Sequence, residues 1–97
     1  MNILQSFKES LQHSSPPSNL GPILKSLWYD AKGDWDSAHA QVDQLNDRDS
    51  AWVHAYLHRK EGDLWNADYW YGRAKKNRPD VTLEEEWEKL LELFLTK

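Results

Sequence analysis

Apolar residues at helical spacing constrain this sequence more than any other feature. In its last segment Leu83, Trp87, Leu90, Leu91 and Phe94 recur at intervals of mostly three or four positions. That spacing places side chains on one face of an α-helix. No segment of strand length alternates with period two and ends in hairpin turn signals. We therefore predict an all-α fold.

Glycine, proline and short polar stretches divide the chain into six predicted helices. The pair of prolines in HSSPPSN ends the first helix and marks a linker. We expect one helical domain, 1–97, in which 1–19 form an N-terminal arm and linker, 20–80 two helical hairpins and 81–97 a capping helix. The predicted helices cover about residues 2–12, 21–32, 35–46, 50–61, 64–77 and 82–97.

The same turn chemistry occurs twice, in KGD at 32–34 and EGD at 61–63. Gly33 and Gly62 suit the left-handed conformation that ends many helices. Asp34 and Asp63 then suit the N-cap of the following helix. Each Gly–Asp pair is therefore predicted to join two consecutive helices.

Two further helix starts have side chains that can cap them. Asp49 or Ser50 is the predicted N-cap of the fourth helix. Thr82 and Glu85 form a T-x-x-E capping box at the start of the last helix. The stretch EEEWEK at 84–89 is interpreted as a solvated helix start, and the helix dipole favours the acidic residues 84–86 within it.

Composition excludes several classes of function. The net charge is −4 and charges of both signs are interspersed, which argues against a nucleic-acid-binding face. The chain has no Cys, and no stretch approaches the ~20 apolar residues of a membrane span. Its start lacks the pattern of a signal peptide. We expect a cytoplasmic protein that binds neither nucleic acid nor membrane.

Across roughly residues 21–80 the chain resembles the tetratricopeptide-repeat family. The second hairpin carries the residues of that family's motif. It has Gly62 in the turn and Pro79 after the second helix, and small residues within the helices at Ala55, Ala67 and Ala74. The first hairpin matches at Ser26, Gly33 and Ala38. Leu45 replaces its second Ala, and its closing Pro is missing. The two glycines lie 29 residues apart, where the family has about 34.

The resemblance implies a non-enzymatic protein-interaction module. In that family the first helix of each hairpin lines a groove that holds a peptide or a partner helix. For this chain we expect the occupant to be a peptide, a partner helix or a second copy of the chain. Trp, Tyr and Arg are also the residue types that dominate binding energy at interfaces. The alternative is that Trp52 and Tyr56 are buried under the N-terminal helix. Carried over by position, the groove would present Ile23, Leu27, Asp30, Asp49, Trp52, Tyr56 and Arg59.

The helical wheel separates the aromatic residues of the fifth helix. Trp70 falls on the side predicted to form the core. Trp65 and Tyr69 point the other way, and we expect them to meet the last helix through Trp87 or Leu91. A small-molecule pocket lined by Trp52, Tyr56 and Trp70 is a further possibility.

The histidines are the one group with chemical potential. His54 and His58 are four residues apart on one helix, a spacing that can chelate zinc. Glu61 could supply a third ligand, and His39 could approach from the neighbouring helix. The Glu of a zincin motif is absent after His54. Hydrogen-bonded, half-buried imidazoles are therefore the preferred interpretation, with metal binding as the alternative; no cofactor and no catalytic residue is predicted.

Overall fold

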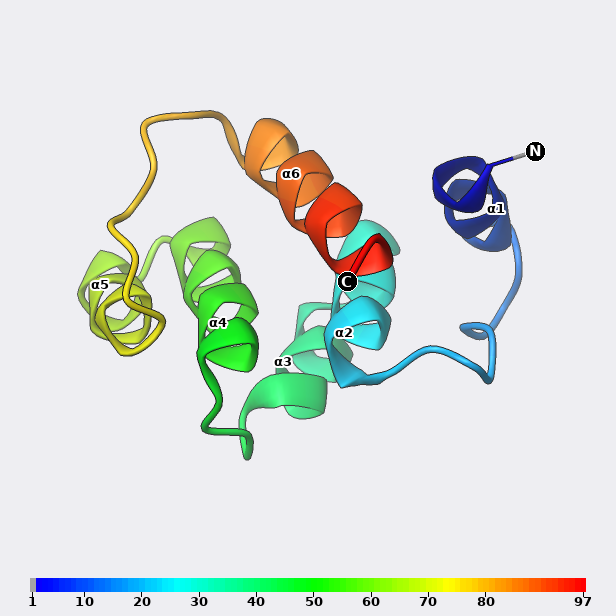
Figure 1. Ribbon diagram of the computed structural model, residues 1–97. Helices are drawn as coiled ribbons and strands as arrows, with labels where there is room; N and C mark the ends of the chain where they lie inside the picture. Colours follow the sequence, from blue (N-terminus) through cyan, green and yellow to red (C-terminus); the bar gives the residue numbers. More distant parts are fainter. Residues whose placement is uncertain (1) are drawn as a thin grey trace.

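A computed structural model describes residues 2–97 and contains six α-helices within them (Figure 1). No strand occurs in this range, so the predicted all-α fold is confirmed. Measured against the thickness of a lipid bilayer, none of these helices combines enough length with enough apolar sequence to cross one. The helices are α1 (Ile3–Ser10), α2 (Pro22–Ala31), α3 (Trp35–Val42), α4 (Arg48–Glu61), α5 (Leu64–Arg73) and α6 (Leu83–Leu95).

The predicted Gly–Asp turns are confirmed. Gly33 and Gly62 have φ of 81° and 89°, in the left-handed region. The Asp34 carboxylate accepts from the backbone N–H of Ser37, as Asp63 accepts from that of Asn66. These hydrogen bonds satisfy helix N–H groups that have no partner inside the helix.

The other predicted caps have different outcomes. The Thr82–Glu85 capping box is present. The fourth helix, in contrast, starts earlier than predicted. Asp47 is its N-cap and accepts from the N–H of Ser50 at 3.0 Å, so the prediction of Asp49 or Ser50 is wrong. All three residues are suitable caps, so capping chemistry alone does not distinguish Asp47 from the other two.

Consecutive helices pack in pairs, and α6 lies across them. α2 packs against α3, and α4 against α5. α6 lies on α2 and α4, with α1 on its other side, as Figure 1 shows. The shared core contains Leu27, Trp28, Val42, Val53, Leu57, Leu90 and Leu91.

The expected contact between α6 and the outer aromatics of α5 is absent. Trp65 is 78% exposed and Tyr69 48% exposed, so the prediction that they meet Trp87 or Leu91 is wrong. α5 instead turns Ala67 and Tyr71 towards α4. The segment 74–82 then carries the chain past α4, and α6 settles on the α2 side (Figure 1).

The N-terminal helix is attached to this body by side chains. Phe7 is buried in the core against the rings of α6, 6.3 Å from Trp87. The Trp28 indole N–H donates to the Ser10 hydroxyl at 3.1 Å. The Lys32 ammonium donates to the carbonyl of Leu11 at 2.6 Å. These bonds fasten the end of α1 and the start of the linker to α2 and the residue that follows it.

Candidate functional site

The face at which the resemblance places a partner is covered by α6. Leu27, Asp30 and Tyr56 are buried. The Trp87 indole N–H, from α6, donates to the Leu27 carbonyl at 3.1 Å. Trp52 is half-buried, with its ring 6.1 Å from that of Phe94. An intramolecular helix therefore occupies most of this face.

The remaining groove residues lie at its edges. Arg59 is half-buried and pairs with Glu86 at 2.8 Å. Ile23 and Asp49 are half-buried, and Asp49 pairs with Lys97 at 3.0 Å. Arg59 and Asp49 are therefore already paired with charged residues, one in α6 and one at the chain end that follows it.

Beneath α6, Asp30 and Tyr56 form a buried polar pair. The phenol donates to the Asp30 carboxylate at 2.7 Å, and Lys60 pairs with the other oxygen at 2.8 Å. Burial, and then the Asp30 charge, raises the pKa of the Tyr56 phenol well above its usual range. Tyr56 therefore remains a hydrogen-bond donor at all moderate pH values.

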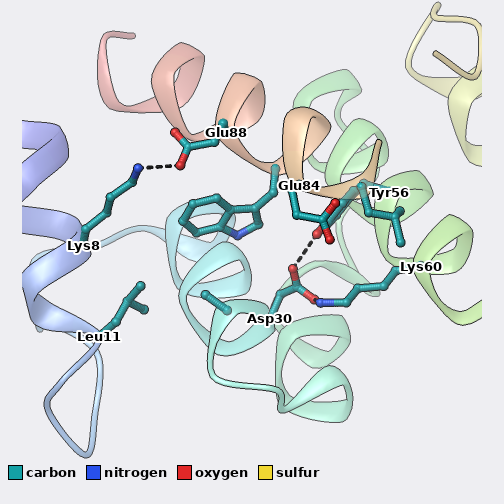
Figure 2. A pocket seen from close by; sticks show the side chains of 10 residues that line it. Lys8, Leu11, Asp30, Tyr56, Lys60, Glu84 and Glu88 are labelled. Carbon is teal, nitrogen blue, oxygen red and sulfur yellow. Dashed lines mark hydrogen bonds and ion pairs between the residues drawn. The ribbon is translucent and has the colours of Figure 1, made fainter. Parts of the chain in front are cut away.

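A cavity of about 420 Å³ opens beside this pair, between α1 and α6. Figure 2 shows Lys8 and Glu88 paired at one end of it, with Asp30, Tyr56 and Lys60 at the other end. Leu11, Ala31, Leu83 and Trp87 form apolar walls. The volume suits a small molecule. The charged side chains around the cavity are already paired, however, Lys8 with Glu88 and Lys60 with Asp30. Tyr56 lines this cavity and Trp52 lines different ones, so the two do not share the pocket considered from the sequence.

A second candidate is the histidine cluster of His39, His54 and His58. The Nε2 atoms of His39 and His54 lie 3.0 Å apart. One ring nitrogen of each of the three histidines lies within 4.8 Å of the others. His39 comes from α3, and the other two from successive turns of α4. The predicted hydrogen bonds of His54 and His58 are therefore present, and they include His39, but the prediction that these two rings are half-buried is wrong because both are buried.

Two tryptophans fix the rings of this cluster. Trp35 stacks on His39 with centroids 4.8 Å apart, and Trp70 stacks on His54 at 4.0 Å. Trp35 is held by its indole N–H, which donates to the Leu57 carbonyl at 2.8 Å. Trp70 was predicted to lie in the core. Its contact with His54 was not predictable from the sequence, because that contact depends on how α5 rotates against α4.

The electrostatics of the cluster favour neutral imidazoles. Burial, assisted by the neighbouring His39 and His58, lowers the pKa of His54 to about 4. Burial also lowers the pKa of His39, although Asp43 opposes this change. At neutral pH both rings therefore retain a lone pair that can bind a proton or a metal.

The carboxylate expected as a third ligand has another role. Glu61 Oε1 lies 2.6 Å from Nδ1 of His58 and orients that ring. His54, His58 and Glu61 are thus not grouped as the sequence suggested. A separate group joins His58 and Glu61 to Asp63, which is exposed and caps α5.

The third candidate is an exposed row along α5, here called the α5 ladder: Trp65, Tyr69 and Arg73. The Trp65 and Tyr69 rings are nearly parallel, 12° apart, with centroids 6.5 Å apart. Arg73 donates to the Tyr69 hydroxyl at 2.9 Å and lies over its ring. Trp65 and Tyr69 were singled out from the sequence, but they were expected to pack against the last helix.

Comparisons with known proteins give no relative for this arrangement. No family model, no curated protein and no solved structure matches the chain.

Proposed function

We propose that this chain is a non-enzymatic protein-interaction module that docks through the α5 ladder to the same ladder of a second copy. The observation that carries this proposal is the 78% exposure of Trp65, a side chain that normally gathers apolar area in a core. Single exposed apolar residues are common. Trp65 is instead followed by Tyr69 and Arg73 along one helix face, and these three are the residue types enriched at binding hot spots.

The order of residues in the ladder supports self-association. Positions 65, 69 and 73 are spaced by four, so they share a face over about 12 Å of helix. If two such faces meet antiparallel about a two-fold axis, Tyr69 lies near the axis. Trp65 then lies opposite Arg73 of the second copy. A guanidinium over an indole is a favourable cation–π contact, and a two-fold arrangement makes it twice.

Sedimentation velocity over a wide range of protein concentration tests this proposal. We expect the apparent mass to rise from one chain to two. The Trp65→Ala/Tyr69→Ala variant should remain a monomer, and Arg73→Glu should weaken the dimer. Ile3→Ala, which removes another exposed apolar side chain on a different helix, is the matched control and should dimerise normally. A wild-type chain that stays monomeric throughout, or a dimer that survives the double variant, overturns the proposal.

We further propose that α2 to α5 form two tetratricopeptide-like hairpins with α6 in the place of the peptide ligand. The two Gly–Asp turns and the small residues Ala38, Ala55 and Ala67, all fully buried, support this relationship. An experimental structure, superposed on such repeats, tests it. Hairpins that fail to share the family's angle between helices would rule it out.

A further inference from the structure

We propose that the histidine cluster, His39, His54 and His58, binds one divalent transition-metal ion of the zinc class. The proposal rests on the positions of ring nitrogens and carboxylates in α3 and α4. It is independent of the proposed self-association, because the ladder lies on α5.

The spacing of the nitrogens fits a tetrahedral ion. With Zn–N bonds of about 2.0–2.1 Å, two ligand nitrogens of a tetrahedral site lie roughly 3.3 Å apart. The Nε2 atoms of His39 and His54 lie 3.0 Å apart, with one proton between them. An ion can take the place of that proton after a small separation of the rings. His58 has a ring nitrogen within 4.8 Å of both, close enough to complete three ligands by side-chain rotation.

One ring is oriented by a carboxylate in the manner of metal-binding histidines, and a second has a carboxylate nearby, beyond hydrogen-bond distance. Such histidines usually donate their second ring N–H to a carboxylate, a carbonyl or water, which fixes the tautomer. Glu61 lies 2.6 Å from Nδ1 of His58, and Asp43 lies 3.8 Å from Nδ1 of His39. Both contacts use Nδ1, so Nε2 is the nitrogen left for the ion.

His54 adds an independent observation. Its side chain is buried, and its Nδ1 has no hydrogen-bond partner among residues 2–97. A buried ring with a single polar contact is incompletely satisfied. A metal ion bound to this ring would add a strong polar bond to a side chain that now has only one.

The surroundings favour a nitrogen-binding ion with one open position. Trp35 and Trp70 stack on the rings and shield one side from water. The His39 side chain is about one quarter exposed, at 26%, which leaves a route for the ion and for a water ligand. Three imidazoles with no thiolate suit Zn²⁺, Cu²⁺ or Ni²⁺ better than Ca²⁺ or Mg²⁺.

The acidic group of His58, Glu61 and Asp63 is the competing location. Asp63 is engaged by the Asn66 backbone and by its amide group at 2.8 Å. Glu61 is engaged by His58. The carboxylates of Glu61 and Asp63 are exposed, and exposed acidic groups are common without a metal. We therefore place the ion at the three histidines.

Isothermal titration of the full chain with Zn²⁺, after treatment with chelator, tests the site. We expect one ion per chain, and with Co²⁺ the visible absorption of a tetrahedral complex. His39→Ala should weaken binding at least about tenfold, since it removes one ligand. This residue is only partly buried, so the fold should survive, which circular dichroism checks. Glu61→Gln should weaken binding by about 10–100-fold through the loss of ring orientation.

His13→Ala is the matched control, because His13 is exposed in the linker. It should bind Zn²⁺ as the wild type does. Absence of saturable one-to-one binding overturns the proposal, as does unchanged affinity in His39→Ala. A loss confined to Asp63→Ala and Glu61→Gln would move the ion to the acidic group and overturn the three-histidine assignment.

Discussion

The hydroxyl of Tyr71 lies 2.7 and 2.8 Å from the two carboxylate oxygens of Glu86, inside the protein. Arg59 pairs with the same carboxylate at 2.8 Å and also donates to the Val81 carbonyl. One buried carboxylate thus links α4, α5 and α6. Burial, and then the bond to Glu86, raises the pKa of the Tyr71 phenol well above its usual range, so Tyr71 remains the donor.

Removing this carboxylate should destabilise the fold strongly. Glu86→Ala leaves the Arg59 guanidinium and the Tyr71 hydroxyl without their shared partner. Breaking a buried pair from one side costs about 3–5 kcal/mol. Urea unfolding followed by circular dichroism measures this loss. Glu84→Ala, exposed on the same helix, is the control and should change stability by less than about 0.5 kcal/mol. Equal midpoints for the two variants would contradict the role of Glu86.

Two neighbouring tryptophans of α5 should respond very differently to truncation. Trp70 is half-buried and stacks on His54, so Trp70→Ala should cost about 2–4 kcal/mol. Trp65 is exposed, and Trp65→Ala should cost less than about 0.5 kcal/mol in the monomer. Urea titrations at low protein concentration compare them. A larger loss for Trp65 would mean that α5 is rotated on α4 relative to this structure.

The buried His54 should make the metal-free protein sensitive to acid. An unfolded His titrates near pH 6.5, whereas folding lowers the pKa of His54 to about 4. Between these values the unfolded chain binds the additional proton, so stability rises with pH. This contribution of His54 to the stability of the fold is fully present above about pH 6.5. It declines by roughly 3 kcal/mol as the pH falls to about 4. His39, whose pKa is also lowered, acts in the same direction.

The groups facing His54 are His39 from α3, Asp43 at the C-cap of α3, and His58 from α4. Thermal melts between pH 7.5 and 4 in excess chelator measure the slope. His54→Phe keeps a ring for Trp70 to stack on but cannot titrate, so its profile should be flatter. His13→Ala should keep the wild-type slope, since His13 is exposed. A wild-type slope in His54→Phe would assign the acid sensitivity to other groups.

The helices and their turns were predictable because their signals are local. Gly33, Gly62 and Thr82 act on backbone groups within four residues, and each took the conformation expected from the sequence. The cap of α4 was misassigned because Asp47, Asp49 and Ser50 have the same capping chemistry. Local signals therefore give the type of each element more reliably than its first residue.

The position of α6 was not predictable from local patterns. Its anchor, the Trp87 N–H bound to the Leu27 carbonyl, joins positions 60 residues apart. The interpretation of 84–86 as solvated is wrong for Glu86, which is buried while Glu84 and Glu85 are exposed. A carboxylate in an acidic run gives no sign that a distant Arg and Tyr will enclose it. His54 and His58 were identified from their spacing, whereas the approach of His39 was only a possibility until α3 was placed against α4.

The same substitution at two glycines should change stability in opposite directions. Gly62 has φ of 89°, which an L side chain adopts only with strain, so Gly62→Ala should cost about 1 kcal/mol or more. Gly72 lies inside α5, is exposed, and has no atom within 4 Å of an added Cβ. Gly72→Ala should therefore stabilise the chain by about 0.5–1 kcal/mol, because alanine loses less backbone entropy in a helix. Urea midpoints of the two variants measure both signs, and a stabilising Gly62→Ala would show that the turn between α4 and α5 does not need its left-handed residue.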